Sequence, residues 1–160
     1  MGVPVVGLYV ATMAAATIIQ CPTCATKNRV GPSRDGIPRC SVCHTILPWL
    51  VDASPSTFEE EITASVPVLV DFWAPWCGPC RMVSPLVEQA GREHAGRLKV
   101  VKLNVDDATE ISRHYGVQGI PLLVLLREGR EVDRLVGAVP RQRLQEWLAP
   151  HLRMASETAS

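Results

Sequence analysis

The stretch Trp73-Ala74-Pro75-Trp76-Cys77-Gly78-Pro79-Cys80 lies at a change of secondary structure. Residues 66–73, which lead into it, are apolar except for Asp71, as expected of a strand that is buried on both faces. Residues from about Cys77 to Glu93 are predicted to form a helix, which Pro85 should kink. The sequence therefore predicts a buried strand that leads into a helix, with a cysteine at the junction.

A cysteine at the first turn of a helix has the surroundings that a reactive thiol needs. The unpaired backbone N–H groups and the positive end of the helix dipole stabilise the thiolate over the thiol. Thiols of Cys-x-x-Cys motifs in such places have pKa values of about 7 or below. The two intervening residues place the second sulfur within bonding distance of the first. We therefore expect Cys77 to attack a substrate disulfide and Cys80 to resolve the mixed disulfide.

The other four cysteines have the spacing Cys21-x2-Cys24-x15-Cys40-x2-Cys43, which is typical of a zinc ribbon. Each Cys-x-x-Cys pair presents two thiolates, and two pairs complete a tetrahedron. Residues 21–46 are too few and too rich in turn residues to bury a core, so we expect a structural Zn2+ to fold them. These four ligands leave none for a second site, which favours a redox role for Cys77 and Cys80 over a metal-binding or structural one.

Other interpretations of the four cysteines stay open. The stretch Cys40-Ser41-Val42-Cys43-His44 also fits a haem attachment signature, and His44 could replace Cys43 as a ligand. Two disulfides would suit an exported protein. Zinc ribbons often bind nucleic acid, but four basic residues without interleaved aromatic residues do not predict that partner here. These basic residues are Lys27, Arg29, Arg34 and Arg39.

Length and composition limit the organisation of the chain. Its 160 residues suffice for one domain and a small accessory module, and the 47% of hydrophobic residues allow a proper core. The 16 basic and 16 acidic residues balance, which argues against nucleic acid or a membrane surface as a partner of the whole chain. We divide the chain into an apolar leader or misassigned start (1–20), a zinc ribbon (21–46), an α/β domain (49–150) and a tail (151–160).

The α/β domain is predicted from alternating periodicities. The expected strands are 49–52, 66–73, 98–105, 122–126 and 132–136, the last two joined in a hairpin through residues 127–130. Ser56-Thr57-Phe58-Glu59 fits a capping box that opens a brief helix through Thr63. Further helices are expected over 77–93, over 108–115 and after Pro140. The order β-α-β-α-β-α-β-β-α predicts a mixed sheet that is covered by helices.

The first 26 residues carry no charged side chain, and residues 3–19 are mostly apolar. A secretory signal peptide would have basic residues before the apolar stretch, and a membrane span would be more hydrophobic. Translation could also begin at Met13. We favour a short tail or a leader over an anchor.

Residues 49–150 resemble the thioredoxin family in three segments. Residues 70–80 look like the family's active-site segment, Lys102-Leu103-Asn104-Val105-Asp106 resembles its next strand, and residues 115–121 resemble the segment that ends in its cis-proline. With the four-cysteine front, the chain is most similar to the two-domain bacterial thioredoxins with an N-terminal zinc ribbon. The resemblance implies a thioredoxin fold, in which helices flank a central mixed β-sheet, preceded by the small zinc ribbon.

The resemblance also implies roles for single residues. Taken alone, Asp71 is either a buried carboxylate with a raised pKa or a residue on a solvated strand face. The family pattern makes it the proton carrier beneath Cys80, with Lys102 close by to tune it. Leu122 departs from the family, which usually has Thr after the cis-proline, and this could alter which partners dock. The implied docking groove consists of Trp76, Gly78, Pro79, Gly119, Ile120, Pro121, Gly137 and Ala138.

The function implied by the resemblance is that of a protein-disulfide reductase. Its partners would be oxidised protein substrates and an NADPH-dependent thioredoxin reductase that recharges it, and the catalytic site would hold no bound cofactor. We expect a cytoplasmic monomer that takes part in electron transport and cell redox homeostasis. Two alternatives remain, a zinc-ribbon binding module on a thioredoxin scaffold and an exported oxidant. Gly78-Pro79 resembles the reductant class.

Overall fold

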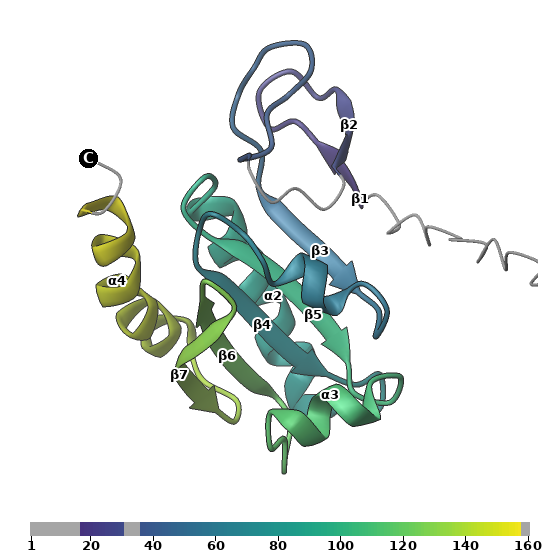
Figure 1. The fold of residues 1–160 in the computed structure, drawn as a ribbon. Helices are drawn as coiled ribbons and strands as arrows, with labels where there is room; N and C mark the ends of the chain where they lie inside the picture. The colour runs from purple at the N-terminus through teal and green to yellow at the C-terminus, as the bar shows by residue number, and fades with distance from the viewer. Residues whose placement is uncertain (1–16, 31–35, 158–160) are drawn as a thin grey trace, which may run out of the picture.

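The computed structural model describes residues 17–30 and 36–157. Its centre is a five-stranded sheet with the strand order β3-β5-β4-β6-β7 (Figure 1). These strands are β3 Trp49–Ala53, β4 Val68–Trp73, β5 Lys99–Asn104, β6 Leu122–Arg127 and β7 Arg130–Val136. Strands β3, β5 and β4 are parallel, whereas β6 runs antiparallel to β4 and β7 antiparallel to β6. This confirms the expected mixed α/β sheet.

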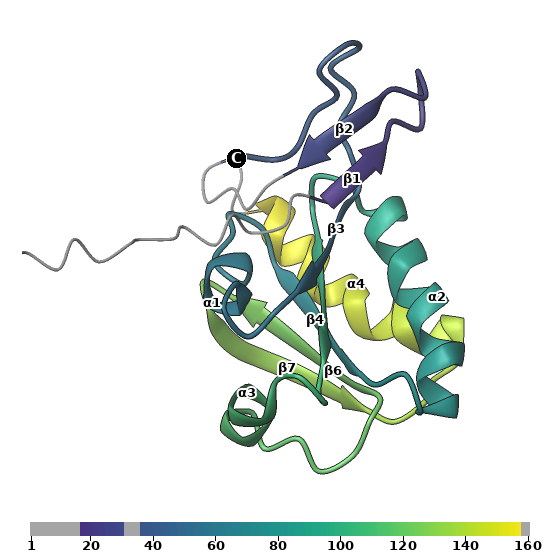
Figure 2. The ribbon, with the colours of Figure 1, turned by 90° about the vertical axis from the view of Figure 1, so that its right-hand side faces the viewer.

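Four helices cover the two faces of this sheet (Figure 2). Helices α2 Gly78–Glu93 and α4 Arg141–Glu157 pack on one face, over a core that includes Leu69, Leu123 and Leu125. Helices α1 Phe58–Glu61 and α3 Thr109–His114 lie on the other face. The strands β4 and β6 are buried along almost their whole length because both of their faces are covered.

The ribbon module stands at one end of the sheet, above β3 (Figure 1). Strands β1 Thr17–Gln20 and β2 Lys27–Val30 form its antiparallel pair. Thr17–Gln20 therefore belongs to the ribbon, although the sequence analysis assigns these residues to the leader. The ribbon's buried Ile19, Val30 and Leu47 join the same apolar cluster as Trp49 and Val51 of β3. The module thus shares a core with the α/β domain.

Three local expectations differ from the structure. The capping box is wrong, because the helix begins at Phe58 with Thr57, not Ser56, as its N-cap residue. Thr57 makes no side-chain bond to the helix, and its Oγ1 accepts from the Ser54 N–H at 2.9 Å instead. The hairpin turn is shorter than expected, with only Glu128 and Gly129 between the strands, both at positive φ. Helix α4 continues to Glu157, past residue 150.

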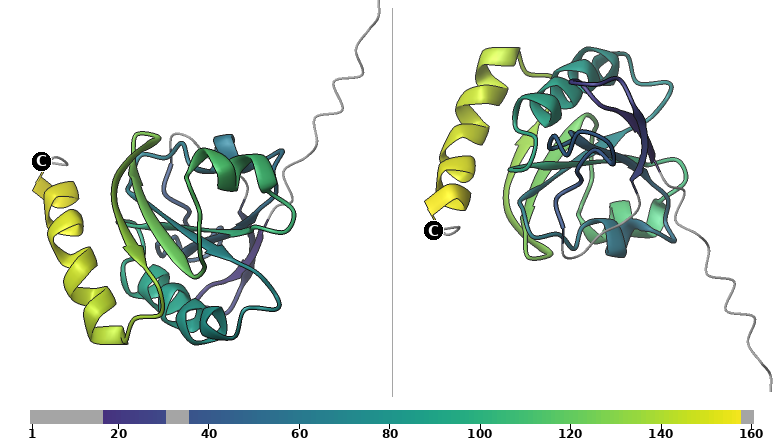
Figure 3. Two further views of the ribbon diagram at one scale, coloured as in Figure 1. Left: turned by 90° about the horizontal axis from the view of Figure 1, so that it is seen from below. Right: turned by 90° about the horizontal axis from the view of Figure 1, so that it is seen from above.

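Figure 3 shows α4 from below and above, lying along one side of the sheet as the last element of the chain. Its Leu144, Trp147 and Leu148 are buried, as the predicted apolar face requires. Among the helices of the described residues, none is both long and apolar enough to cross a membrane. Residues 1–16, most of the predicted leader, lie outside the described residues.

Candidate functional site

The two cysteines of the redox motif lie at the start of α2 and form a disulfide, with their Cα atoms 5.3 Å apart. Cys77 is the N-cap residue, and its Sγ accepts a hydrogen bond from the Cys80 N–H at 3.2 Å. Both residues are buried. The strand β4 ends at Trp73, and a turn closed by the Cys77 N–H and the Ala74 carbonyl leads into the helix. Cys77 thus sits where N–H groups stabilise a thiolate.

The segment before β6 contacts the disulfide. The Ile120–Pro121 peptide bond is cis, as the resemblance implies. The Ile120 carbonyl oxygen lies 3.8 Å from Cys77 Sγ. The Pro121 carbonyl accepts a hydrogen bond from the Gly137 N–H at 3.0 Å. This bond connects the turn after β7 to the cis-proline segment before β6. Ile120, which is 43 positions from Cys77 in the sequence, therefore contacts the disulfide.

A shallow groove of about 450 Å³ runs beside the disulfide. Of the residues expected to dock substrates, Trp76, Gly119 and Ile120 line it, whereas Gly78, Pro79, Pro121, Gly137 and Ala138 do not. Trp76 is 68% exposed, and its Nε1 donates to both carboxylate oxygens of Asp106, at 3.0 and 3.1 Å. Asp106 is not among the site residues expected from the sequence, although it belongs to a segment that resembles the family. Further lining residues were not expected either, including Val105, Arg113, Val117 and Gln118.

Asp71 is fully buried on β4, which excludes a place on a solvated strand face. The Ser84 hydroxyl donates to its Oδ2 at 3.2 Å, while Oδ1 has no hydrogen-bond partner. Burial raises the pKa of Asp71 to about 6, the charge of Glu88 acts in the same direction, and Lys102 and Ser84 oppose it. A carboxyl group with this pKa can exchange a proton near neutral pH.

Lys102 lies directly opposite Asp71 on the neighbouring strand β5. Its Nζ is 3.0 Å from Glu88 Oε1 and 5.3 Å from the centre of the Trp73 ring. The sequence analysis placed Lys102 near Asp71 but identified neither Glu88 nor Ser84. Both could have been found from the helical spacing Cys80, Ser84, Glu88, which places three polar residues on one stripe of an otherwise apolar face.

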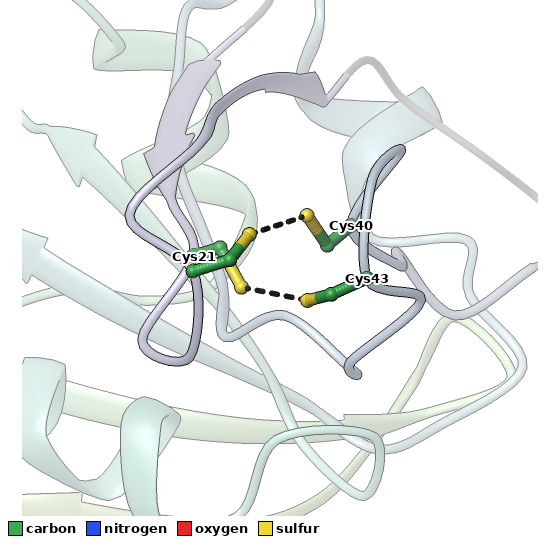
Figure 4. A group of neighbouring side chains, drawn as sticks. Cys21, Cys40 and Cys43 are labelled. Carbon is green, nitrogen blue, oxygen red and sulfur yellow. Dashed lines mark hydrogen bonds between the residues drawn. The ribbon is translucent and has the colours of Figure 1, made fainter.

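The ribbon brings its four cysteines together, as Figure 4 shows for Cys21, Cys40 and Cys43. All four sulfurs lie within 4.8 Å of one another, and the Cys21–Cys43 and Cys24–Cys40 sulfurs are 3.5 Å apart. None of the four is in a disulfide. Four thiolates around a tetrahedral Zn2+ with bonds of about 2.3 Å are separated by about 3.8 Å. The donor set and its size therefore fit a metal ion, and His44 is not among the clustered residues.

The two halves of this cluster have the same local structure. Each first cysteine donates its N–H to a threonine carbonyl five residues on, Thr26 or Thr45, at 2.8 Å. Its sulfur faces the backbone N–H two residues on, at 3.4 Å for Cys21 and 3.5 Å for Cys40. The backbone N–H of Cys43 is the main cause that lowers the pKa of the Cys40 thiol to about 6. Such repeated turns present sulfurs as thiolate ligands.

A disulfide at the first turn of a helix, with a cis-proline beside it and a buried carboxyl group on the strand that leads into that helix, defines a thiol–disulfide oxidoreductase. The chain belongs to the thioredoxin family, whose model, described as Thioredoxin, matches residues 49–150. It is 50% identical over 98 residues to Thioredoxin 1 of Nostoc sp., covering 61% of this chain and 92% of that protein. It is 47% identical over 106 residues to Thioredoxin of Synechocystis sp., covering 66% and 96%.

A thioredoxin of Alicyclobacillus acidocaldarius gives a similar match, with 44% identity over 104 residues that cover 65% of this chain and 96% of that protein. The family and the disulfide of Cys77 and Cys80 make this protein a thioredoxin-type disulfide oxidoreductase that performs thiol–disulfide exchange.

Proposed function

We propose that the protein is a protein-disulfide reductase that an NADPH-dependent thioredoxin reductase recharges, and that it works in the cytoplasm. The observation that carries the proposal is the Cys77–Cys80 disulfide at the N-terminus of α2, next to cis-Pro121. An oxidised protein would dock as an extended segment in the groove beside Trp76 and Ile120. Leu122, the unusual residue after the cis-proline, would then influence which substrates dock.

The proposed reaction begins with the reduced protein. The Cys77 thiolate attacks one sulfur of the substrate disulfide, forms a mixed disulfide and releases the other substrate sulfur as a thiolate. Asp71 takes the proton from the Cys80 thiol, and the Cys80 thiolate attacks Cys77 Sγ. This step forms the Cys77–Cys80 disulfide and releases the second substrate thiolate. Two electrons have passed to the substrate, and NADPH returns them through the reductase.

The test is the reduction of insulin disulfides by NADPH and thioredoxin reductase, with wild type beside Cys77→Ser. We expect turnover by the wild type that the variant loses completely. Absence of turnover by a folded, metal-loaded wild type would contradict the proposal and favour an oxidant or a docking scaffold. If the protein acted only as a zinc-ribbon scaffold, the Cys77→Ser variant would bind its partners as well as the wild type does.

For the N-terminal module, we propose a zinc ribbon with Cys21, Cys24, Cys40 and Cys43 as ligands. A site with four thiolates is coordinatively closed, so Zn2+ would supply folding energy rather than catalysis. Oxidation of these thiolates could release the metal and make the ribbon redox-responsive. Peroxide treatment in the presence of a zinc-chelating dye tests this idea. No release at doses that oxidise Cys77 would refute the redox response.

A further inference from the structure

Three polar residues follow one another along the inner stripe of α2. Cys80, Ser84 and Glu88 are spaced by four residues, so their side chains lie above one another on the helix. Two residues of the sheet face them, since Ser84 contacts Asp71 of β4 and Glu88 contacts Lys102 of β5. This polar column leads from the resolving cysteine to the far half of the helix.

The salt bridge in this column is not the one that the strand register indicates. Asp71 and Lys102 are register partners, so their side chains emerge on the same face of neighbouring strands. The Lys102 ammonium nevertheless forms its salt bridge with Glu88, at 3.0 Å. Asp71 keeps only a hydroxyl donor, from Ser84, and its Oδ1 has no partner. Lys102 therefore stabilises the Asp71 carboxylate less than it would as a direct partner.

No other group offsets this arrangement among the described residues around Asp71. The charges that act on the carboxyl group are those of Lys102 and Glu88, and Ser84 is its hydrogen-bond donor. On the other side, β6 pairs the apolar Leu123 with Asp71. Glu88 thus favours the protonated acid in two ways, by its own negative charge and by its hold on Lys102. Ser84 acts in the opposite direction.

The exposed end of the column lies between the two modules of the protein. Glu88 and Lys102 line a groove of about 520 Å³, together with β1 of the ribbon and residues of β3. The other charged residues in its lining are Arg92 of α2 and Asp52 of β3, which is the register partner of Lys102. The Glu88 side chain is 34% exposed and that of Lys102 is 18% exposed, whereas Asp71 is fully buried. Solvent therefore reaches the column through the groove that the ribbon helps to enclose.

We infer that Glu88 is a positioning residue for the proton step of the redox site, which holds Lys102 at the ribbon groove and thereby keeps Asp71 able to bind a proton. The inference rests on the proposed function of Asp71 and adds two residues to it, Glu88 and Ser84, with opposite effects. The ribbon strand β1 lines the same groove as the Glu88–Lys102 pair.

The experiment is an NMR titration of the Asp71 carboxyl carbon in the oxidised full-length protein labelled with [13C]aspartate. The signal that Asp71→Asn removes identifies the residue. We expect Glu88→Gln to lower the titration midpoint by roughly half a pH unit or more, and Ser84→Ala to raise it. The acid limb of the pH profile of insulin reduction should shift to lower pH in Glu88→Gln and to higher pH in Ser84→Ala. The NMR midpoint is readable even if the wild type reduces no insulin, so failure of the proposed function is distinguishable.

Glu93→Gln is the matched control. Glu93 lies on the same helix, is 36% exposed and forms its own salt bridge with Arg141 at 2.8 Å. The substitution therefore removes an equal charge from a residue that is not among the groups acting on Asp71. It should leave the midpoint unchanged. A midpoint in Glu88→Gln that equals that of wild type would overturn the inference.

A double variant tests whether Glu88 acts through Lys102. If Glu88 holds the ammonium away from Asp71, the effect of Glu88→Gln must shrink in a Lys102→Met background. An equal effect in both backgrounds would reduce the role of Glu88 to direct charge repulsion and would overturn the positioning role.

Discussion

Asp71 and Lys102 lie opposite each other on β4 and β5, yet the Lys102 ammonium pairs with Glu88 rather than with Asp71. The buried Asp71 carboxyl group is therefore left with a single hydroxyl donor, that of Ser84. Burial alone would make its ionised form costly, and the pairing of Lys102 elsewhere keeps that cost high. Its energetic state has consequences for both stability and reactivity.

Asp71→Asn should stabilise the folded protein at neutral and alkaline pH. Burial raises the pKa of Asp71 to about 6, so between roughly pH 4 and pH 6 the folded state holds a proton that the unfolded state releases. The stabilising contribution of this proton is present below pH 4 and is lost as the pH rises through 6. At pH 8 the variant should gain about 2 kcal/mol in its free energy of unfolding.

Urea denaturation of the oxidised protein at pH 4 and pH 8 measures this difference. The Asn side chain keeps an oxygen that can accept the Ser84 hydroxyl, so the packing changes little. An equal effect of the substitution at the two pH values would show that Asp71 does not titrate as its burial requires.

Cys80→Ser should accumulate a covalent complex with a disulfide substrate. Cys77, at the N-cap of α2, can still attack, but no second thiol remains to release the substrate. Incubation of the reduced variant with oxidised insulin followed by non-reducing mass spectrometry should show an adduct that dithiothreitol removes. The variant Cys77→Ser should form none. An adduct of similar yield in Cys77→Ser would show that Cys77 is not the attacking cysteine and would contradict the prediction.

Cys40→Ser should abolish metal binding and unfold the ribbon. Cys40 is buried, and its sulfur lies 3.5 Å from that of Cys24 and 3.6 Å from the Asn28 amide nitrogen. We expect elemental analysis to find one zinc per wild-type chain and none in the variant, with dispersed NMR signals of residues 17–30 lost. The free energy at stake is on the order of 10 kcal/mol. Cys77→Ser, which leaves the ribbon intact, should keep its zinc; full metal content in Cys40→Ser would refute the ligand set.

Glu61→Gln should destabilise the protein by breaking its buried ion pair with Lys99. Lys99 is fully buried, 2.8 Å from Glu61, and its Nζ lies 4.4 Å from the centre of the Trp49 ring. Removal of one partner leaves a buried charge without compensation, which costs about 3 kcal/mol. Glu59→Gln, on the exposed side of the same short helix, is the control. Equal urea midpoints for the two variants would contradict the importance of the pair.

Much of the fold was predictable because its signals are local. The apolar run of β4, which only Asp71 interrupts, the strand-to-helix change at Cys77 and the apolar face of α4 each follow from neighbouring residues. Errors arose where a side chain had a choice of nearby partners. Thr57 could cap a helix or close the turn at Ser54, and the structure shows the second. No periodic pattern of residues distinguishes these two partners.

The ribbon illustrates the same limit. The spacing of its cysteines predicts two similar turns, and both are present with matching hydrogen bonds. The spacing does not predict that Thr17–Gln20 pairs with β2, because that strand is only four residues long and lies next to an apolar stretch. Nor does it predict that Ile19 and Val30 share a core with Trp49. These contacts depend on how the two modules pack.

The sequence by itself determined the redox chemistry of this protein, because a reactive disulfide requires only two cysteines, two residues between them and a helix that begins there. It also determined the order of strands and helices along the α/β domain and the grouping of the four ribbon cysteines. Only the tertiary structure decided the surroundings of Asp71. Its burial, its bond to Ser84 and the pairing of Lys102 with Glu88 join residues from three separate elements. Electrostatic free energies depend on such distances and on exclusion of water, which no local pattern contains.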